Sequence, residues 1–224
     1  AEAKAAYEAG RPSEAASILS ALAAEEGVSP GLHYDFGVSL LDAGECGPAI
    51  LSLERAHWLA PSDAGIAAAL AVARQRAGLP ERHAPAWERA RDVLAPDTWA
   101  TVGGLALVLG CAGGVVWMLD PGRFVRTRGV RRALRAGTAV SSGAFLVAAI
   151  ACASLAGEAS RGIAVGSEVT LRMAPFEGAE PRATLGAGES VRIEERHGAF
   201  VRVRADGARW GWAPASAIGE IVPG

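Results

Sequence analysis

The chain contains 224 residues, which is enough for one large domain or for two small domains with connecting segments. Its net charge of −2 argues against a nucleic acid as partner, because phosphates are bound by a basic face. Its three cysteines are odd in number and widely spaced, which argues against a disulfide framework and a CxxC metal site.

Residues 1–96 contain a helical repeat with a period of 34 residues. Gly10, Gly44 and Gly78 mark this period. Other columns recur at the same spacing, namely Leu19, Leu53 and Trp87, and also Leu22, Ala56 and Ala90. In the middle copy, small residues stand where two antiparallel helices would cross, and Pro61 stands where the second helix would end. The pattern resembles the tetratricopeptide repeat family.

This resemblance implies a stack of helices with a concave groove lined by the first helix of each repeat. In the middle copy we expect Tyr34, Val38 and Leu41 to face the groove and to bind a partner. Packing of these side chains within a short stack is an equal alternative. The third copy, with Trp87 and Leu94, is degenerate, and we expect it to cap the stack and lead into the next segment.

Two apolar segments follow at 97–119 and 136–157, and each contains a long uncharged run. As helices rising about 1.5 Å per residue, both are long enough to cross the roughly 30 Å hydrocarbon layer of a membrane. The alternative is a buried helical hairpin in a soluble core, where two consecutive runs of this length are rare. Gly110 and Gly114 form a GxxxG motif, on which the hairpin packs on itself or docks a partner.

The segment between these runs, 120–135, carries six arginines, and we expect it to be a cytoplasmic loop. Because the positive-inside rule retains such a loop in the cytoplasm, it predicts a bacterial inner-membrane protein with both terminal domains in the periplasm. The chain starts with Ala1-Glu2-Ala3, the kind of end that remains when a signal peptide is removed after small residues, and this also favours export.

After a linker at 158–166, residues 167–224 change to an alternating pattern typical of β-strands. The apolar positions are Val169, Leu171, Met173, Val191, Ile193, Val201 and Val203. Asp206-Gly207 predicts a tight hairpin. The opening LRMAP, the centre GESVRIEERHGAFVRV and the close GWAPASAI resemble bacterial Src-homology-3 (SH3-like) domains. The resemblance implies a small closed or nearly closed all-β barrel.

Three aromatic residues of this domain are candidates for binding a partner: Phe200, Trp210 and Trp212. Phe200 stands where the SH3-like family usually has tryptophan. Trp210 and Trp212 are two residues apart on a predicted strand, so they point to the same face. In the alternative interpretation, Trp212 belongs to the core and Trp210 covers the mouth of the barrel. The acidic, tyrosine-rich motif that binds proline-rich peptides is absent, so that ligand class is not expected.

No motif for catalysis, a cofactor or a metal ion occurs in the sequence. Glu194 and Glu195 are adjacent carboxylates, but neighbours on a strand point in different directions, so we expect them to be solvated rather than to share a proton. We therefore expect no enzyme activity, no cofactor and no metal.

The order of the segments resembles the BatE-type proteins of the Bacteroides aerotolerance operons. The predicted fold class is a multidomain membrane protein with an all-α tetratricopeptide-like repeat, a two-helix transmembrane hairpin and a small all-β SH3-like barrel. The resemblance implies von Willebrand factor A domain proteins and a MoxR-type ATPase system as partners, beside membrane lipid. We expect a non-enzymatic scaffold or adaptor, and the alternative is a module that binds or senses peptidoglycan.

Overall fold

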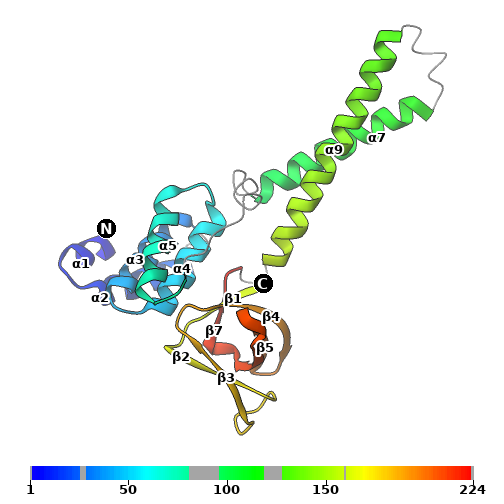
Figure 1. Cartoon of the computed structure of the whole chain (residues 1–224). Helices are drawn as coiled ribbons and strands as arrows, with labels where there is room; N and C mark the ends of the chain where they lie inside the picture. Colours follow the sequence, from blue (N-terminus) through cyan, green and yellow to red (C-terminus); the bar gives the residue numbers. More distant parts are fainter. Residues whose placement is uncertain (1, 26–28, 81–95, 119–127, 159, 223–224) are drawn as a thin grey trace. The chain divides into compact units, whose positions relative to one another are not determined.

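The computed structural model describes residues 2–25, 29–80, 96–118, 128–158 and 160–222 (Figure 1). The chain divides into two compact units, one formed by Ala1–Val93 together with Glu158–Gly224 and the other by Leu94–Gly157. The described helices are α1 (Glu2–Glu8), α2 (Pro12–Glu25), α3 (Pro30–Asp42), α4 (Cys46–Leu59), α5 (Ala64–Arg76), α7 (Pro96–Met118) and α9 (Arg128–Glu158). The strands are β1 (Arg161–Ala164), β2 (Glu168–Arg172), β3 (Pro181–Gly186), β4 (Ser190–His197), β5 (Phe200–Ala205), β6 (Trp210–Pro214) and β7 (Ile218–Glu220).

Helices α1, α3 and α5 end in turns that repeat every 34 residues. Gly10, Gly44 and Gly78 follow these helices with φ angles of 72°, 86° and 70°. In each turn, the glycine N–H donates to the carbonyl three residues back, and the next N–H donates to the carbonyl five residues back. This is the Schellman pattern, which favours glycine because its φ is positive. The glycine spacing therefore marks three equivalent helix ends.

Helices α3 and α4 approach closely because small residues lie between them. A Cβ atom added to Gly37 would lie 2.7 Å from Cγ of Leu53 and 3.2 Å from the carbonyl oxygen of Ala49. Ala49 and Leu53 are fully buried. The predicted need for small residues at this crossing is thus confirmed. The expected third pair of helices cannot be compared in full, because Trp87 and Leu94 lie outside the described residues.

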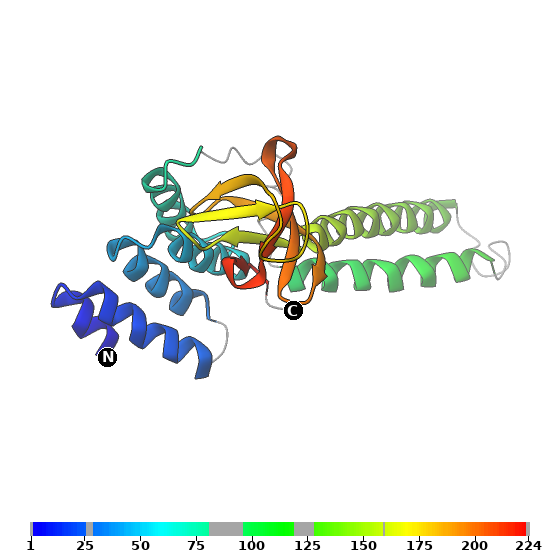
Figure 2. The same ribbon diagram turned by 90° about the horizontal axis from the view of Figure 1, so that it is seen from below.

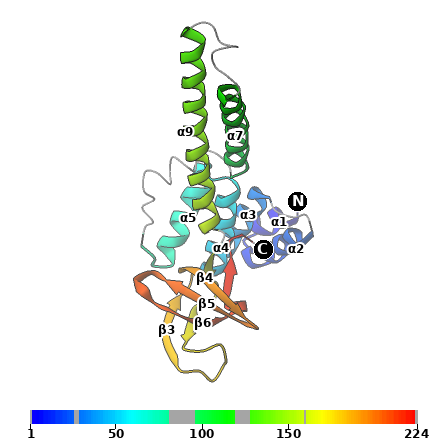
Figure 3. The ribbon, with the colours of Figure 1, turned by 90° about the vertical axis from the view of Figure 1, so that its right-hand side faces the viewer.

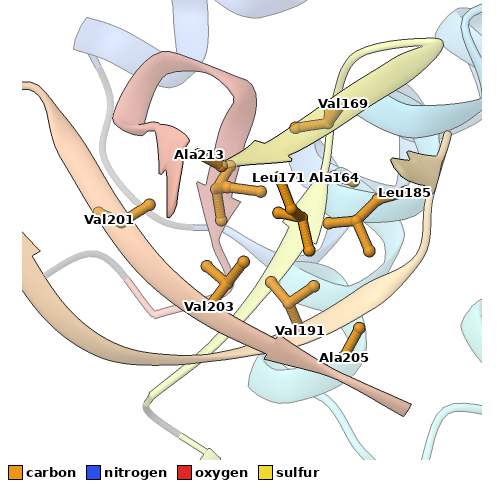
Figure 4. Packing of buried hydrophobic residues seen from close by; sticks show 10 residues of the cluster. Ala164, Val169, Leu171, Leu185, Val191, Val201, Val203, Ala205 and Ala213 are labelled. Carbon is orange, nitrogen blue, oxygen red and sulfur yellow. The ribbon is translucent and has the colours of Figure 1, made fainter. Parts of the chain in front are cut away.

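The strands form one antiparallel, strongly curved half-barrel sheet in the order β3-β2-β6-β5-β4-β1-β7. Its inner face holds a core of valine, leucine and alanine side chains. Figure 4 shows side chains of Leu171, Leu185 and Val203 turned toward one another between strands β2, β3 and β5. All three are fully buried. The alternating apolar pattern from Val169 to Val203 therefore marks the inner face of the sheet, with one exception.

The exception is Met173, which is 47% exposed because β2 ends at Arg172 after an irregularity in its pairing with β3. The hairpins also differ from the prediction. Asp206-Gly207 lies in a three-residue 3-10 turn with Gly207 at a φ of 75°, not in a two-residue hairpin. The shortest hairpin joins β4 to β5, where His197 pairs with Phe200 and Gly198 has a φ of 57°.

Strand β1 lies within the segment 158–166 that was expected to be a linker. It pairs with β4 on one side and with β7 on the other. Ile163 and Ala164 of β1 are fully buried, and they belong to different hydrophobic cores. The β-domain thus begins at Arg161, before the expected boundary at residue 167.

The helices α2–α5 and the sheet share a second hydrophobic core, which contains Ile50 and Ala73 from the helices and Ile163 and Ile221 from the sheet segment. A Cβ atom on Gly47, at the start of α4, would lie 2.6 Å from the carbonyl oxygen of Val165. The helical repeat and the half-barrel are therefore packed into one unit rather than separated by a free linker.

Polar contacts reinforce this junction. Arg55 donates from Nε and Nη2 to the carbonyl oxygen of Glu220 at 3.0 and 2.8 Å. Nη2 of Arg74 lies 2.6 Å from Oε1 of Glu54 and 3.3 Å from Oγ of Ser190. The side chains of Arg74 and Glu54 are only 12% and 4% exposed, so this ion pair is buried between helices and sheet. Removing one partner of such a pair costs about 3–5 kcal/mol.

The second unit contains two helices that are long and apolar enough to cross a membrane, with windows at Thr98–Val115 and Ala136–Ser154. Only 11% of each window is buried within the structure. Large apolar side chains such as Val108 and Leu146 are 65% and 60% exposed. A core helix of a soluble protein would be mostly buried, so this exposure favours the membrane interpretation over the soluble hairpin.

Helices α7 and α9 lie side by side and run antiparallel, as Figures 2 and 3 show. Gly103 faces Ala148, Gly110 faces Ser141 and Gly113 faces Thr138. Gly114 of the expected GxxxG motif has open space around it, so Gly113 is the residue at which α9 comes closest. Small residues at such positions let two helices pack in lipid.

The segment 120–135, expected as a loop, is in part helical. Helix α9 begins at Arg128, eight residues before the apolar segment at 136–157. Residues 119–127 lie outside the described part of the chain. The arginines from Arg128 onward therefore belong to the first turns of a long helix.

Candidate functional site

The three candidate aromatic residues of the β-domain lie on one face of the sheet. In the register of β5 and β6, Phe200 pairs with Pro214, Arg202 with Trp212 and Arg204 with Trp210. Residues directly opposite each other in an antiparallel pair point to the same side. Because Val203 and Ala213 point to the inner core, these aromatics all lie on the outer face. We call it the aromatic face.

The two tryptophans differ in exposure and in their neighbours. Trp212 is buried, with 9% of its surface exposed, and the ring of His197 stands edge-on to it at a centroid distance of 6.3 Å. Trp210 is half-buried, and the Arg182 guanidinium lies 3.8 Å from its ring centroid. Trp212 is thus covered without belonging to the inner core, whereas Trp210 offers part of its ring to a ligand.

Arginine and glutamate side chains surround these aromatics. Glu194 pairs with Arg204 and, at 3.2 Å, with Arg202, and Glu195 also lies 3.2 Å from Arg202. A β-bulge between Ile193 and Glu195 brings both carboxylates to one guanidinium. The hydrogen bond from Arg204, followed by the nearby charges of Arg204 and Arg202, lowers the pKa of Glu194. The two carboxylates are therefore ion-paired, which the alternation rule alone did not predict.

The three candidate residues of the helical groove do not share one environment. Tyr34 and Val38 of α3 are half-buried, and Tyr34 packs against the second core. Leu41 is only 7% exposed and is itself part of that core. Tyr34 and Val38 thus retain surface for a partner, whereas Leu41 acts chiefly in packing.

A polar contact that sequence reasoning missed connects the ends of α1, α3 and α5. The hydroxyl of Tyr7 donates to Oδ2 of Asp42, and Nη1 of Arg76 donates to Oδ1 of Asp42 at 3.1 Å. The hydrogen bond from Tyr7 is the main cause that lowers the pKa of Asp42, and the same bond raises the pKa of Tyr7. Asp42 and Arg76 are 34 residues apart, so the repeat period itself was the signal that could have suggested their contact.

The aromatic face has the chemistry of a binding surface. It combines aromatic rings with the guanidinium groups of Arg182, Arg202 and Arg204, a combination suited to stacking and to anionic groups. The alternation in the β5 sequence predicts that Arg202 and Arg204 point outward, but no local signal places Arg182 over Trp210. Among the described residues, no histidines, cysteines or carboxylates gather in a group that could hold a metal ion.

Comparisons with models of protein families, with curated proteins and with solved structures found no match to this chain. The resemblances to the tetratricopeptide, SH3-like and BatE-type families therefore stay predictions from sequence motifs.

Proposed function

We propose that this protein is a membrane-anchored scaffold without catalytic activity, in which a tetratricopeptide-like repeat and an SH3-like half-barrel together assemble envelope proteins. The observation that carries the proposal is the shared core of the helices and the sheet. This packing gives a partner one rigid platform with two surfaces, the helical groove at Tyr34 and Val38 and the aromatic face at Trp210.

The shared core also supports the proposed topology. Ile50 precedes the two apolar helices in the chain, whereas Ile163 and Ile221 follow them, and all three side chains belong to the same core. Segments that pack together must lie on one side of a membrane. Two spans bring the chain back to its starting side, as this packing requires. The arginines of segment 120–135 favour the cytoplasm for the connection and the periplasm for the platform.

Von Willebrand factor A domain proteins and a MoxR-type ATPase system are the proposed partners, since the sequence resembles BatE-type proteins. The test is purification of the full chain in non-ionic detergent together with co-expressed von Willebrand factor A domain proteins. We expect Tyr34→Ala and Trp210→Ala to lower their recovery. Gln75→Ala, at an exposed position of α5, is the control that should leave recovery unchanged.

Leu41 is not used in this test, because its replacement would disturb the core rather than a surface. Equal urea midpoints for the variants and the parent protein would show that the platform remains folded. Unchanged partner recovery with both Tyr34→Ala and Trp210→Ala would contradict the scaffold proposal.

Binding of peptidoglycan is the second candidate function, and the partly exposed ring of Trp210 favours it, because aromatic rings stack on ligands. The full chain in detergent, mixed with purified peptidoglycan and sedimented, tests this. Co-sedimentation that Trp210→Ala abolishes would favour the cell-wall module, whereas no co-sedimentation would contradict it.

A further inference from the structure

Three arginines and one tryptophan stand in a single row across four adjacent strands. Arg161 of β1 pairs in register with Arg192 of β4, Arg192 pairs with Arg204 of β5, and Arg204 pairs with Trp210 of β6. Since neighbouring strands are about 4.8 Å apart, the three arginines extend over roughly 10 Å on one face of the sheet. We call Arg161, Arg192 and Arg204 the arginine row.

This arrangement opposes folding. Like charges that stand directly opposite each other on neighbouring strands are destabilising, and the arginine row contains two such pairs in succession. A stretch that breaks a local rule without a gain in packing is typical of a functional site. The row therefore calls for an anionic partner outside the chain.

The nearby carboxylates do not neutralise the row. Arg204 pairs with Glu194, but Glu194 also pairs with Arg202, which already contacts Glu195. Arg192 is exposed, and no carboxylate in the described part of the chain forms an ion pair with it. The outer face around the row thus keeps an excess of positive charge.

Chain length places the start of the row near the second apolar helix. The apolar window ends at Ser154, α9 ends at Glu158, and Arg161 follows three residues later. Four helical residues and three fully extended ones reach at most about 17 Å. If α9 spans the bilayer, Arg161 lies within that distance of the end of the apolar window, where lipid headgroups are found.

We propose that the arginine row and Trp210 bind the headgroups of anionic phospholipids. This proposal rests on the membrane anchoring in the proposed function. The charge is complementary, since an arginine near an anionic lipid surface adds about fivefold to the equilibrium for contact. Trp210 ends the row with a partly exposed amphipathic ring, the kind of side chain that favours the membrane interface.

The test uses the full chain with Trp210 replaced by the photoreactive aromatic residue p-benzoylphenylalanine. The protein is reconstituted into vesicles of phosphatidylcholine alone or of equal parts phosphatidylcholine and phosphatidylglycerol, irradiated, and analysed by mass spectrometry for lipid adducts. We expect adducts mainly in the anionic vesicles. Arg192→Gln should lower their yield about fivefold.

Arg196→Gln is the matched control. It removes the same charge from the same strand, but Arg196 pairs in register with the core residue Val201 and so lies on the other face. Adduct yield should not change in this variant. An equal yield in both kinds of vesicle, or an equal loss in Arg192→Gln and Arg196→Gln, would overturn the proposal.

Two further arms separate the possible failures. If inorganic phosphate abolishes the adducts as well as an equal concentration of soluble phosphatidylglycerol does, the row binds free anions and the lipid assignment is wrong. Washing the vesicles with alkaline carbonate tests the anchor itself. Retained protein without lipid adducts overturns only the arginine-row proposal, whereas protein that washes off overturns the proposed anchoring and the headgroup contact that depends on it.

Discussion

At the scale of single residues, His33 makes the stability of the helical repeat depend on pH. Its side chain is 8% exposed, and Nδ1 has no hydrogen-bond partner in the structure. Burial lowers the pKa of His33 below its ordinary value of 6.5, and the nearby charge of Arg55 lowers it further. The folded protein therefore holds this histidine neutral at a pH where the unfolded chain already binds a proton.

We predict that the free energy of unfolding falls as the pH drops below 6.5. His33 contributes at most about 1.4 kcal/mol per pH unit to this fall, down to its lowered pKa, because one proton is involved. In His33→Leu this contribution should vanish. Urea midpoints of the full chain in detergent, measured by pulse proteolysis, provide the test, and at pH 8 the variant shows the packing effect alone. A parallel pH dependence of the two proteins would contradict the prediction.

The residue-scale comparison shows what the sequence can and cannot indicate. Gly10, Gly44 and Gly78 were predictable because each left-handed helix end needs a glycine and the period repeats that need. The contact of Arg182 with Trp210 and that of Arg74 with Ser190 were not predictable. Both join residues from separate elements, and one sequence carries no signal for such pairing.

At the scale of elements, the two apolar helices and most strands follow from periodicity, but two elements do not. Strand β1 has only four residues, and its two faces are buried in two different cores, so no alternation of polar and apolar residues marks it. The start of α9 at Arg128 was hidden because arginine is a good helix former but was interpreted only through its charge.

The contact of α4 with the sheet provides a prediction at this scale. Gly47→Ala should lower the free energy of unfolding by about 1–3 kcal/mol, because its Cβ would press against backbone atoms of Val165 and Ala164, which cannot rotate away. Gly31→Ala is the matched control. Gly31 is also the second residue of its helix, and its nearest neighbour is the Ser29 hydroxyl at 4.0 Å.

The control variant should be neutral or gain up to about 1 kcal/mol, since alanine is a better helix former than glycine. Urea unfolding of the full chain in detergent measures both changes. Equal effects of Gly47→Ala and Gly31→Ala would show that α4 does not press on the sheet as described.

Packing of α7 against α9 gives a second prediction for an element. In a cysteine-free background, Gly103→Cys and Ala148→Cys should form a disulfide, because their Cβ atoms would lie about 3.1 Å apart before adjustment, near the distance that a disulfide bridges. Adding Gly113→Leu should greatly reduce this cross-link, since the side chain would collide with Thr138. Gly114→Leu, one residue later, faces open space and should leave the cross-link intact.

Non-reducing gel electrophoresis of protease-nicked protein would reveal the cross-link. If Gly114→Leu, rather than Gly113→Leu, blocked it, the helices would meet through the GxxxG motif expected from the sequence. The packing described for α7 and α9 would then be wrong.

At the scale of the whole molecule, the folding unit is discontinuous in sequence. Residues before α7 and after α9 share one core, and the apolar helices lie between them as an insertion. The sequence predicted both flanking domains but treated them as separate, because their union depends on contacts such as Gly47 with Val165 that join distant segments. This union is what requires both flanks to lie on the same side of a membrane.

The most direct test of this account is cysteine labelling from outside the inner membrane. Single cysteines are introduced into the cysteine-free chain at Ser62 in the helical repeat, at Ser216 in the β-domain and at Thr127 in the connecting segment. Ser62 and Ser216 are exposed. In intact spheroplasts, a membrane-impermeant maleimide should label Ser62→Cys and Ser216→Cys, and it should label Thr127→Cys only after lysis. Labelling of just one of the first two positions in intact spheroplasts, or labelling of Thr127→Cys before lysis, would contradict the account.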